Sequence, residues 1–231
     1  LWDIAKQYAL ADNLFIGAFG GSFLTHQYLI CACAPTYPNA DTSVAKGSIA
    51  KIDVDAKGNF MEDVPYLGMA AFEVGQKQGA AMAAEAKKRG WDWKDTYAVI
   101  NTFNELDTGK KRTDGSIKSL EDAGLPKDHI LTAALKTLDV PGSMDATNSA
   151  LVKLPSGAKN LIIGGMNDNT VLGGVRATES AGFAAANVIG IGINGTDAIG
   201  ELKKANSGFF GSMLPSPHIE GYKTAEMMYR L

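Results

Sequence analysis

The sequence has little of what nucleic acids and membranes require of a protein. Its formal net charge is -3, and its one dense basic run is Lys110-Lys111-Arg112. Phosphate contacts usually need clustered Lys and Arg, so we expect no nucleic-acid partner. The apolar stretch 14–34 is interrupted by polar side chains from Ser22 to Gln27. Polar groups at the middle of a bilayer are costly, so we expect no membrane insertion.

Cysteine is scarce, and its placement argues against a metal centre. The two cysteines, Cys31 and Cys33, are separated by a single residue. This spacing is not a zinc-site pattern and gives poor disulfide geometry, so we expect buried free thiols and neither a metal nor another cofactor. The chain also lacks a basic segment followed by an apolar core, so we expect no signal peptide within it, and Leu1 is not expected to be a native start.

What the sequence does have is a regular alternation of apolar runs and amphipathic segments from about residue 69. Apolar runs between helices predict a doubly wound α/β domain, in which helices cover both faces of a parallel sheet. The first fifty residues do not continue this rhythm. The expected strands are 96–103, 130–134, 160–164, 188–193 and 209–213, and the expected helices are 69–89, 108–123, 141 to before 155, 170–181, 196–205 and 218–229.

Polar loops follow three of the expected strands and contain Arg112, Asn167, Asn194 and Asp197. Ligands bind outside the carboxyl ends of parallel strands, so these loops are expected to converge on one rim. Planar groups that donate and accept hydrogen bonds suit sugar hydroxyls, whereas phosphate calls for a Gly-rich nest or several cations. The pattern leaves a second interpretation open, because Asn, Asp and Thr near helix starts commonly serve as caps.

Dense motifs run from about residue 55 to the last residue. They are "DVPYLGMAA", "KKRGWDWK", "NELDTGKKRTDGS", "DVPGSMDATNSALV", "GMNDNTVLGGVRATE", "IGIGINGTDAI" and "GSMLPSPHIEGYK". On these motifs the stretch resembles the L-arabinose-binding proteins, the periplasmic receptors of bacterial sugar ABC importers. The resemblance implies a type I periplasmic-binding-protein fold, with two lobes joined by a hinge and the sugar between them. It also implies a periplasmic location and an ABC permease as partner.

The resemblance also assigns roles to individual residues. It makes Arg112, Asn167 and Asn194 hydrogen-bonding contacts to a monosaccharide, expected to be L-arabinose, D-galactose or D-fucose. Asp168 and Asn169 are then expected to cap the following helix. The remaining positions that it assigns are Asp197, beside the polar contacts, and Leu106, Thr108, Met166 and Met69, lining the cleft.

The chain departs from this family before residue 55. The first lobe of the family should supply an opposing wall with a Lys, a Glu, an aromatic residue and an Asp close to the hinge. The position of that Asp falls on Lys51. The last strands of the family are also expected to be missing after Leu231. We therefore expect one complete lobe at about 69–214 and an incomplete first lobe.

Residues 1–52 resemble a segment of the bacterial phosphoesterases that include acid phosphatases and phospholipases C. The resemblance places Ser22 at the nucleophile position, and "FGGS" opens a helix whose N–H groups would suit a phosphoryl group. The metal ligands of that family are not matched, and a serine without metal or base cannot turn over. We therefore expect Ser22 to be a helix cap and the chain not to be an enzyme.

These observations predict a composite chain. Residues 1–54 are expected to be a phosphoesterase-like fragment, and residues 55–231 a sugar-binding-protein fragment. The expected function is that of the substrate-binding component of a bacterial ABC importer. Two alternatives are left open, a metal-dependent phosphoesterase fragment that uses Ser22 and a composite with no surviving activity.

Overall fold

The computed structural model describes residues 70–216, 218–219, 222–223 and 226. Ser22, Met69, the boundary near residue 54 and most of the expected last helix lie outside these residues. Within them the strands are β1 (Thr96–Thr102), β2 (Ile130–Ala134), β3 (Asn160–Gly165), β4 (Val188–Ile193) and β5 (Phe209–Met213). The helices are α3 (Ala71–Lys88), α4 (Asp107–Asp122), α5 (Val140–Leu151), α6 (Asp168–Ser180) and α7 (Ala198–Glu201), with 3-10 turns at Lys127–His129 and Ala185–Asn187.

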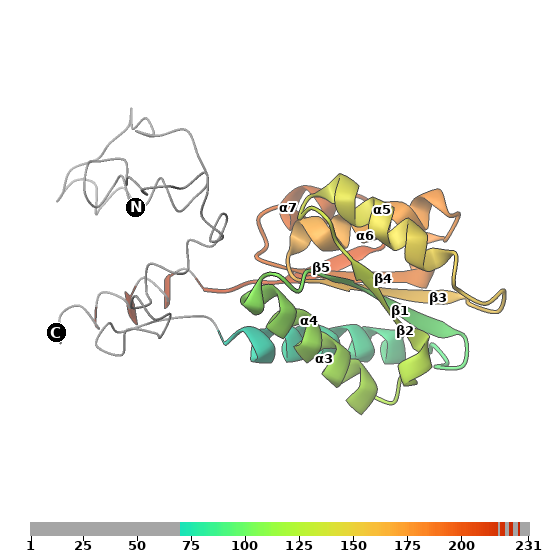
Figure 1. The fold of residues 1–231 in the computed structure, drawn as a ribbon, viewed down its shortest axis with the longest axis horizontal. Coiled ribbons are helices and arrows are strands. Elements are labelled where there is room, and N and C mark those ends of the chain that lie inside the picture. Colours follow the sequence, from blue (N-terminus) through green and yellow to red (C-terminus); the bar gives the residue numbers. More distant parts are fainter. Residues whose placement is uncertain (1–69, 217, 220–221, 224–225, 227–231) are drawn as a thin grey trace, which may run out of the picture. The chain divides into compact units, whose positions relative to one another are not determined.

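The five strands form one parallel sheet in the order β2-β1-β3-β4-β5. The chain leaves β1 toward one edge of the sheet, to β2, and then returns past β1 to β3. The direction of winding therefore reverses between β1 and β3. Helices α3 and α4 cover one face of the sheet, and α5, α6 and α7 cover the other (Figure 1). The predicted doubly wound α/β lobe is confirmed.

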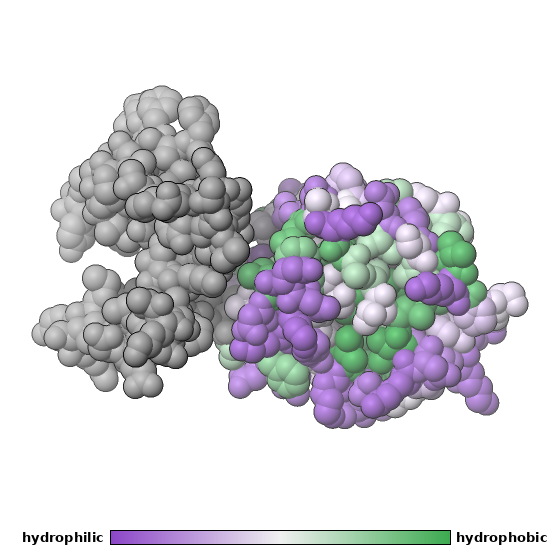
Figure 2. Space-filling model, in the orientation of Figure 1, coloured by the Kyte–Doolittle hydropathy of each residue, from purple (hydrophilic) through white to green (hydrophobic). Residues whose placement is uncertain are grey.

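The two faces of the sheet bury separate apolar clusters because side chains alternate along each strand. Ile100 belongs to the cluster that contains Met82 of α3 and Leu120 of α4. Its neighbour Val99 belongs to the cluster that contains Val171 of α6. Outside these clusters the surface is mixed, and Figure 2 shows apolar residues in the middle of the viewed face with hydrophilic residues around them. The central strands are thus covered on both sides, as their unbroken apolar sequence requires.

Glycines let α3 and α4 approach each other closely. A Cβ atom on Gly75 of α3 would lie 2.7 Å from the carbonyl carbon of Arg112 and closer still to its oxygen. A Cβ atom on Gly115 of α4 would lie 2.8 Å from the backbone nitrogen of Gln76. Backbone atoms cannot rotate out of the way, so these glycines set the distance between the helices. They thereby fix the place of Arg112.

The last complete helix is shorter than the sequence predicts. We expected a helix at 196–205, but α7 spans Ala198–Glu201. The side chain of Glu201 is 5% exposed. It forms ion pairs with Arg176 and Lys204 and accepts a hydrogen bond from Ser207. Lys204 lies after the end of α7, within the segment that we expected to be helical. The strands agree with prediction within one residue at each end, and no helix in the described residues is long and apolar enough to cross a membrane.

Candidate functional site

The polar loops lie at the carboxyl ends of β1, β3 and β4, and two of them meet where the winding reverses. Arg112 lies in the second turn of α4, after β1, and Met166 directly follows β3. The Nη1 of Arg112 donates a hydrogen bond to the carbonyl oxygen of Met166 at 2.8 Å. The reversal point between β1 and β3 is where doubly wound sheets bind ligands. The structure therefore places a guanidinium group at that point.

The apolar residues predicted for the site gather around the start of α4. The side chain of Met166 is 6% exposed. A Cβ atom on Gly109 would lie 2.8 Å from the Met166 Sδ and 3.6 Å from the Leu106 Cβ, so both side chains border Gly109. Leu106 is 40% exposed, and Thr108 is exposed in the first turn of α4. Leu106 thus offers exposed apolar surface at the start of α4, the helix that carries Arg112.

Asn167 is the N-cap of α6, which corrects the expectation that Asp168 and Asn169 cap this helix. Its Oδ1 accepts the backbone N–H of Thr170 at 3.0 Å, and the Thr170 Oγ1 accepts the N–H of Asn167 at 3.3 Å. Asn167 is the last residue with extended backbone, at φ -156°, so its side chain is the one that reaches the third helical residue. Asp168 and Asn169 lie inside the first turn. Capping engages the Oδ1 of Asn167, and its half-buried amide nitrogen can still donate to a ligand.

Asn194 directly follows β4 in a conformation that few side-chain-bearing residues adopt. Its φ is 106°, in the region that favours glycine, and its N–H donates to the carbonyl of Met213 at 2.9 Å. Its side chain is exposed, as is that of Asp197. Thr196 donates to the Asp197 carboxylate at 3.4 Å. The hydrogen bond that Asp197 accepts among the described residues therefore comes from its own loop.

The backbone of Asn194 leads to a first mutational prediction. Asn194→Gly should raise the free energy of unfolding by roughly 0.5–1 kcal/mol, because glycine adopts a positive φ at little cost and strain of this kind costs about 1–3 kcal/mol. Denaturant unfolding measures this change. Asn194→Ala is the matched variant, which keeps a Cβ and should be no more stable than the parent. A glycine variant less stable than the parent would contradict the strain argument.

Buried polar groups lie behind the rim. The Gln78 side chain of α3 is fully buried, and its Nε2 donates to the carbonyls of Gly165 at 3.0 Å and Ile191 at 2.6 Å. Its Oε1 accepts from Ser116 of α4. Gln78 therefore links the carboxyl ends of β3 and β4 to both helices of that face. A glutamine in an Ala-rich helix gives no sequence signal for this role, and we did not predict it.

A charged cluster fixes the helix that follows the Asn194 loop. Burial acts to raise the pKa of the Glu201 carboxyl, but hydrogen bonds from Lys204, Ser207 and Arg176 outweigh burial and lower it. Arg176 belongs to α6, so the cluster ties α7 to α6. No three His, Cys, Asp or Glu side chains in the described part of the chain are arranged to hold a metal ion.

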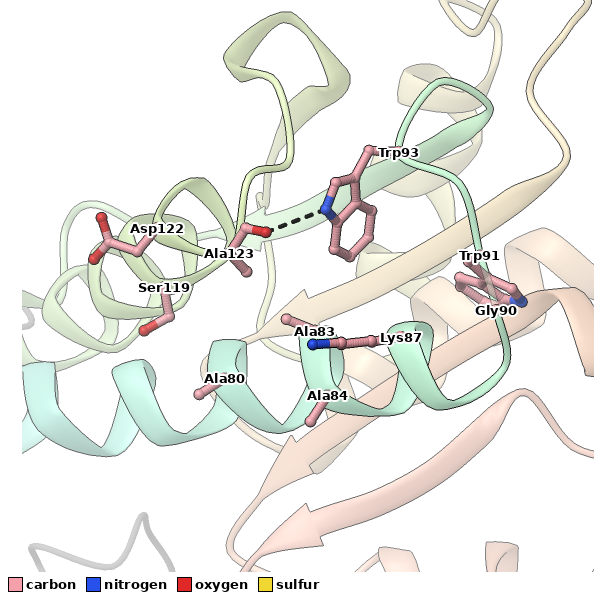
Figure 3. Close-up of a pocket in the computed structure, with 10 residues that line it drawn as sticks. All are labelled: Ala80, Ala83, Ala84, Lys87, Gly90, Trp91, Trp93, Ser119, Asp122 and Ala123. Carbon is pink, nitrogen blue, oxygen red and sulfur yellow. Dashed lines mark hydrogen bonds between the residues drawn. The ribbon is translucent and has the colours of Figure 1, made fainter.

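A separate pocket of about 770 Å³ lies between α3 and α4, next to the residues that precede β1 and hence toward the amino ends of the strands. Figure 3 shows alanines of α3 and Ser119 of α4 on its walls, with Trp93 between the two helices. The Nε1 of Trp93 donates to the carbonyl of Ala123 at 3.1 Å, and both Trp91 and Trp93 pack against the core cluster of this face. These tryptophans precede β1, so the pocket is remote from the polar loops.

The comparisons with known proteins agree on one family. The model for periplasmic binding proteins and the sugar-binding domain of the LacI family matches residues 29–231. An L-arabinose-binding periplasmic protein of Escherichia coli (strain K12) is 48% identical over 209 residues, covering 87% of this chain and 63% of the relative. An ABC transporter L-arabinose-binding periplasmic protein of Azospirillum brasilense is 41% identical over 222 residues, covering 93% and 64%. The chain thus spans slightly less than two thirds of the length of these relatives.

Solved structures agree in fold. An ABC transporter periplasmic solute-binding protein from Actinobacillus succinogenes 130z, with bound D-allose, matches with a TM-score of 0.52 at 22% identity, covering 70% of this chain and 52% of that one. A LacI family transcriptional regulator from Silicibacter pomeroyi matches with a TM-score of 0.53 at 16% identity, covering 71% and 56%. Nothing in these matches supports the phosphoesterase resemblance of residues 1–52, and the family match begins inside that segment. The chain belongs to the family of periplasmic binding proteins and sugar-binding domains of the LacI type.

Proposed function

We propose that this chain acts in the periplasm as the substrate-binding component of a bacterial ABC importer, or as part of one, and binds L-arabinose or a related monosaccharide. The observation that carries the proposal is the hydrogen bond from Arg112 to the Met166 carbonyl at the reversal point of the sheet. It holds a planar cation beside Asn167, with the apolar Met166 and Leu106 next to it. This mixture suits a sugar, which offers hydroxyls at its edge and C–H groups on its faces.

The proposal gives each predicted residue a role. Arg112, Asn167 and Asn194 contact hydroxyls of the sugar, and Asp197 stands beside them on the Asn194 loop. Leu106, Thr108 and Met166, together with Met69, line the apolar side. All these proposed contacts lie within residues 55–231. The proposed role is binding for transport and not catalysis, in keeping with relatives that are named as binding proteins.

We expect weak affinity, about millimolar, which corresponds to roughly -4 kcal/mol. Each hydrogen bond adds about 0.5–1.5 kcal/mol where water competes with the ligand. Titration of the full chain with L-arabinose, D-galactose and D-fucose, followed by amide NMR, tests this. Shifts should appear at Met166, Asn167 and Asn194. Their absence at about 50 mM sugar, well above the expected dissociation constant, or shifts confined to residues 1–54, would reject the proposal.

A further inference from the structure

Asp168 lies directly behind the proposed sugar contacts, and its carboxylate is buried. It follows Asn167 at the first position of α6 and is 1% exposed. It packs against Gly192 of β4. A Cβ atom on Gly192 would overlap the Oδ1 of Asp168 and would lie 2.9 Å from its Cα. A glycine in β4 therefore makes the room that lets this carboxylate turn inward, away from solvent.

Both oxygens of the carboxylate accept hydrogen bonds from other elements at the same rim. The Oδ1 accepts the hydroxyl of Ser212, in β5, at 2.6 Å. The Oδ2 accepts the backbone N–H of Ala198, the first residue of α7, at 3.3 Å. Asp168 thus joins the ends of β3 and β5 to the start of α7. A negative charge is also favoured in the first turn of α6, where backbone N–H groups point toward it.

These two bonds act on the loop that carries Asn194 and Asp197. At its beginning the loop is held by the N–H of Asn194, which donates to the carbonyl of Met213 next to Ser212. At its end it is held by the N–H of Ala198, which follows Asp197 and donates to Asp168. The exposed residues between these points, with Asn194 at a φ of 106°, have no comparable attachment to Asn167 among the described residues.

We propose that Asp168 is a positioning residue of the binding site: its buried carboxylate sets the distance between Asn167, beside it on α6, and the loop that carries Asn194 and Asp197. Its oxygens face inward and do not touch the sugar. This inference rests on the proposed function, since the residues that it positions are the proposed sugar contacts. Burying a carboxylate costs free energy, and the hydrogen bonds from Ser212 and Ala198 offset part of that cost.

Asp168→Ala removes both bonds and tests the inference in the full chain. We expect the affinity for L-arabinose to fall by about tenfold or more, in line with the loss of a hydrogen bond to a charged group. In the sugar-free protein, hydrogen exchange at Ala198 should accelerate by about tenfold or more. Exchange at Thr170, which Asn167 caps, should stay unchanged. Asp168→Ser, whose single short oxygen cannot reach both partners, serves the same comparison if the alanine variant does not fold.

Asp168→Asn is the conservative variant that separates geometry from charge. Its amide oxygen can accept from Ala198, and the Ser212 hydroxyl can turn to accept from its amide nitrogen. We therefore expect Asp168→Asn to keep most of the affinity and of the Ala198 protection. Equal losses in the Asn and Ala variants would overturn the positioning role. So would an Ala variant with unchanged affinity and unchanged exchange.

Thr96→Val is the matched control for general loss of stability. Thr96 is buried at the start of β1, and its hydroxyl donates to the backbone carbonyl of Asp92 at 2.7 Å. Its loss should destabilise the lobe while leaving sugar affinity within about twofold, since Thr96 lies at the amino end of its strand, away from the Asn194 loop. The exchange measurement needs no ligand. If the parent chain binds no sugar, the proposed function fails. Hydrogen exchange at Ala198 still shows whether Asp168 holds the Asn194 loop in place.

Discussion

Gly75→Ala is expected to lower the free energy of unfolding by about 3 kcal/mol, the upper end of the usual cost of overpacking. The added methyl would lie 2.7 Å from the carbonyl carbon of Arg112 and closer to its oxygen. Neither atom can move without shifting α4. Alanine favours a helix over glycine by roughly 0.5–1 kcal/mol, which is too little to offset the clash. Denaturant unfolding, or a thermal midpoint lower by roughly 6–12 °C for a lobe of this size, measures the change.

Gly200→Ala provides the control, because it makes the same substitution where there is space. Gly200 lies in α7, and a Cβ atom there would have no atom within 4 Å. This variant should be as stable as the parent or more stable by up to about 1 kcal/mol. A Gly75→Ala protein that unfolds within about 0.5 kcal/mol of the parent, the usual range for surface changes, would show that α3 and α4 separate easily. The position of Arg112 would then not be fixed by helix packing.

The sheet was predictable because each strand carries its own signal. β4 reads "VIGIGI" and is buried at every position, and β3 reads "NLIIGG" with a single half-buried residue at its start. Unbroken apolar runs of this kind between helices are typical of central parallel strands. The short α7 was not predictable, because its end depends on a long-range pair. Arg176, 25 residues earlier in the chain, reaches Glu201, and no local pattern announces that contact.

The polar loops were predictable as a group, but the role of each side chain within them was not. Asn167, Asp168 and Asn169 are consecutive and all favour helix starts, so the sequence could not say which one caps α6. The backbone decides it, because Asn167 is the last extended residue. The next residue then points into the interior, where Gly192 leaves room. To predict a buried carboxylate at Asp168, one would need to know in advance that the start of α6 packs against Gly192 of β4.

Gln78 marks the limit of prediction from sequence. Its acceptors are the carbonyls of Gly165 and Ile191, which lie 87 and 113 residues away. Backbone carbonyls carry no sequence signal, and a glutamine within an alanine-rich helix suggests an exposed position. Only the folded arrangement explains why Gln78 is buried, because α3 then lies against β3 and β4 and brings its side chain to these carbonyls. Buried amides of this kind are retained because each of their polar atoms finds a partner.

Arg112→Ala is expected to weaken binding of L-arabinose by at least about a hundredfold, or roughly 2.7 kcal/mol. Two losses combine in this variant. The proposed donors to the sugar disappear, and hydrogen bonds to a charged group are worth about 1.5–3 kcal/mol each. The carbonyl of Met166 also loses its partner at 2.8 Å, so the loop between β3 and α6 is no longer tied to α4. NMR titration should then show no saturation at about 100 mM sugar, since the parent is expected to bind near 1 mM.

Two further variants locate the cause of that loss. Arg112→Lys keeps the charge but not the planar fork that serves two acceptors, so its affinity should fall between those of the parent and the alanine variant. Lys118→Ala removes a cation from the same helix, where Lys118 forms an exposed ion pair with Asp122. Exposed pairs contribute little, so this variant should bind sugar as the parent does. If Arg112→Lys binds as tightly as the parent, positive charge alone suffices at the reversal point. If Arg112→Ala does so, the sugar does not bind there.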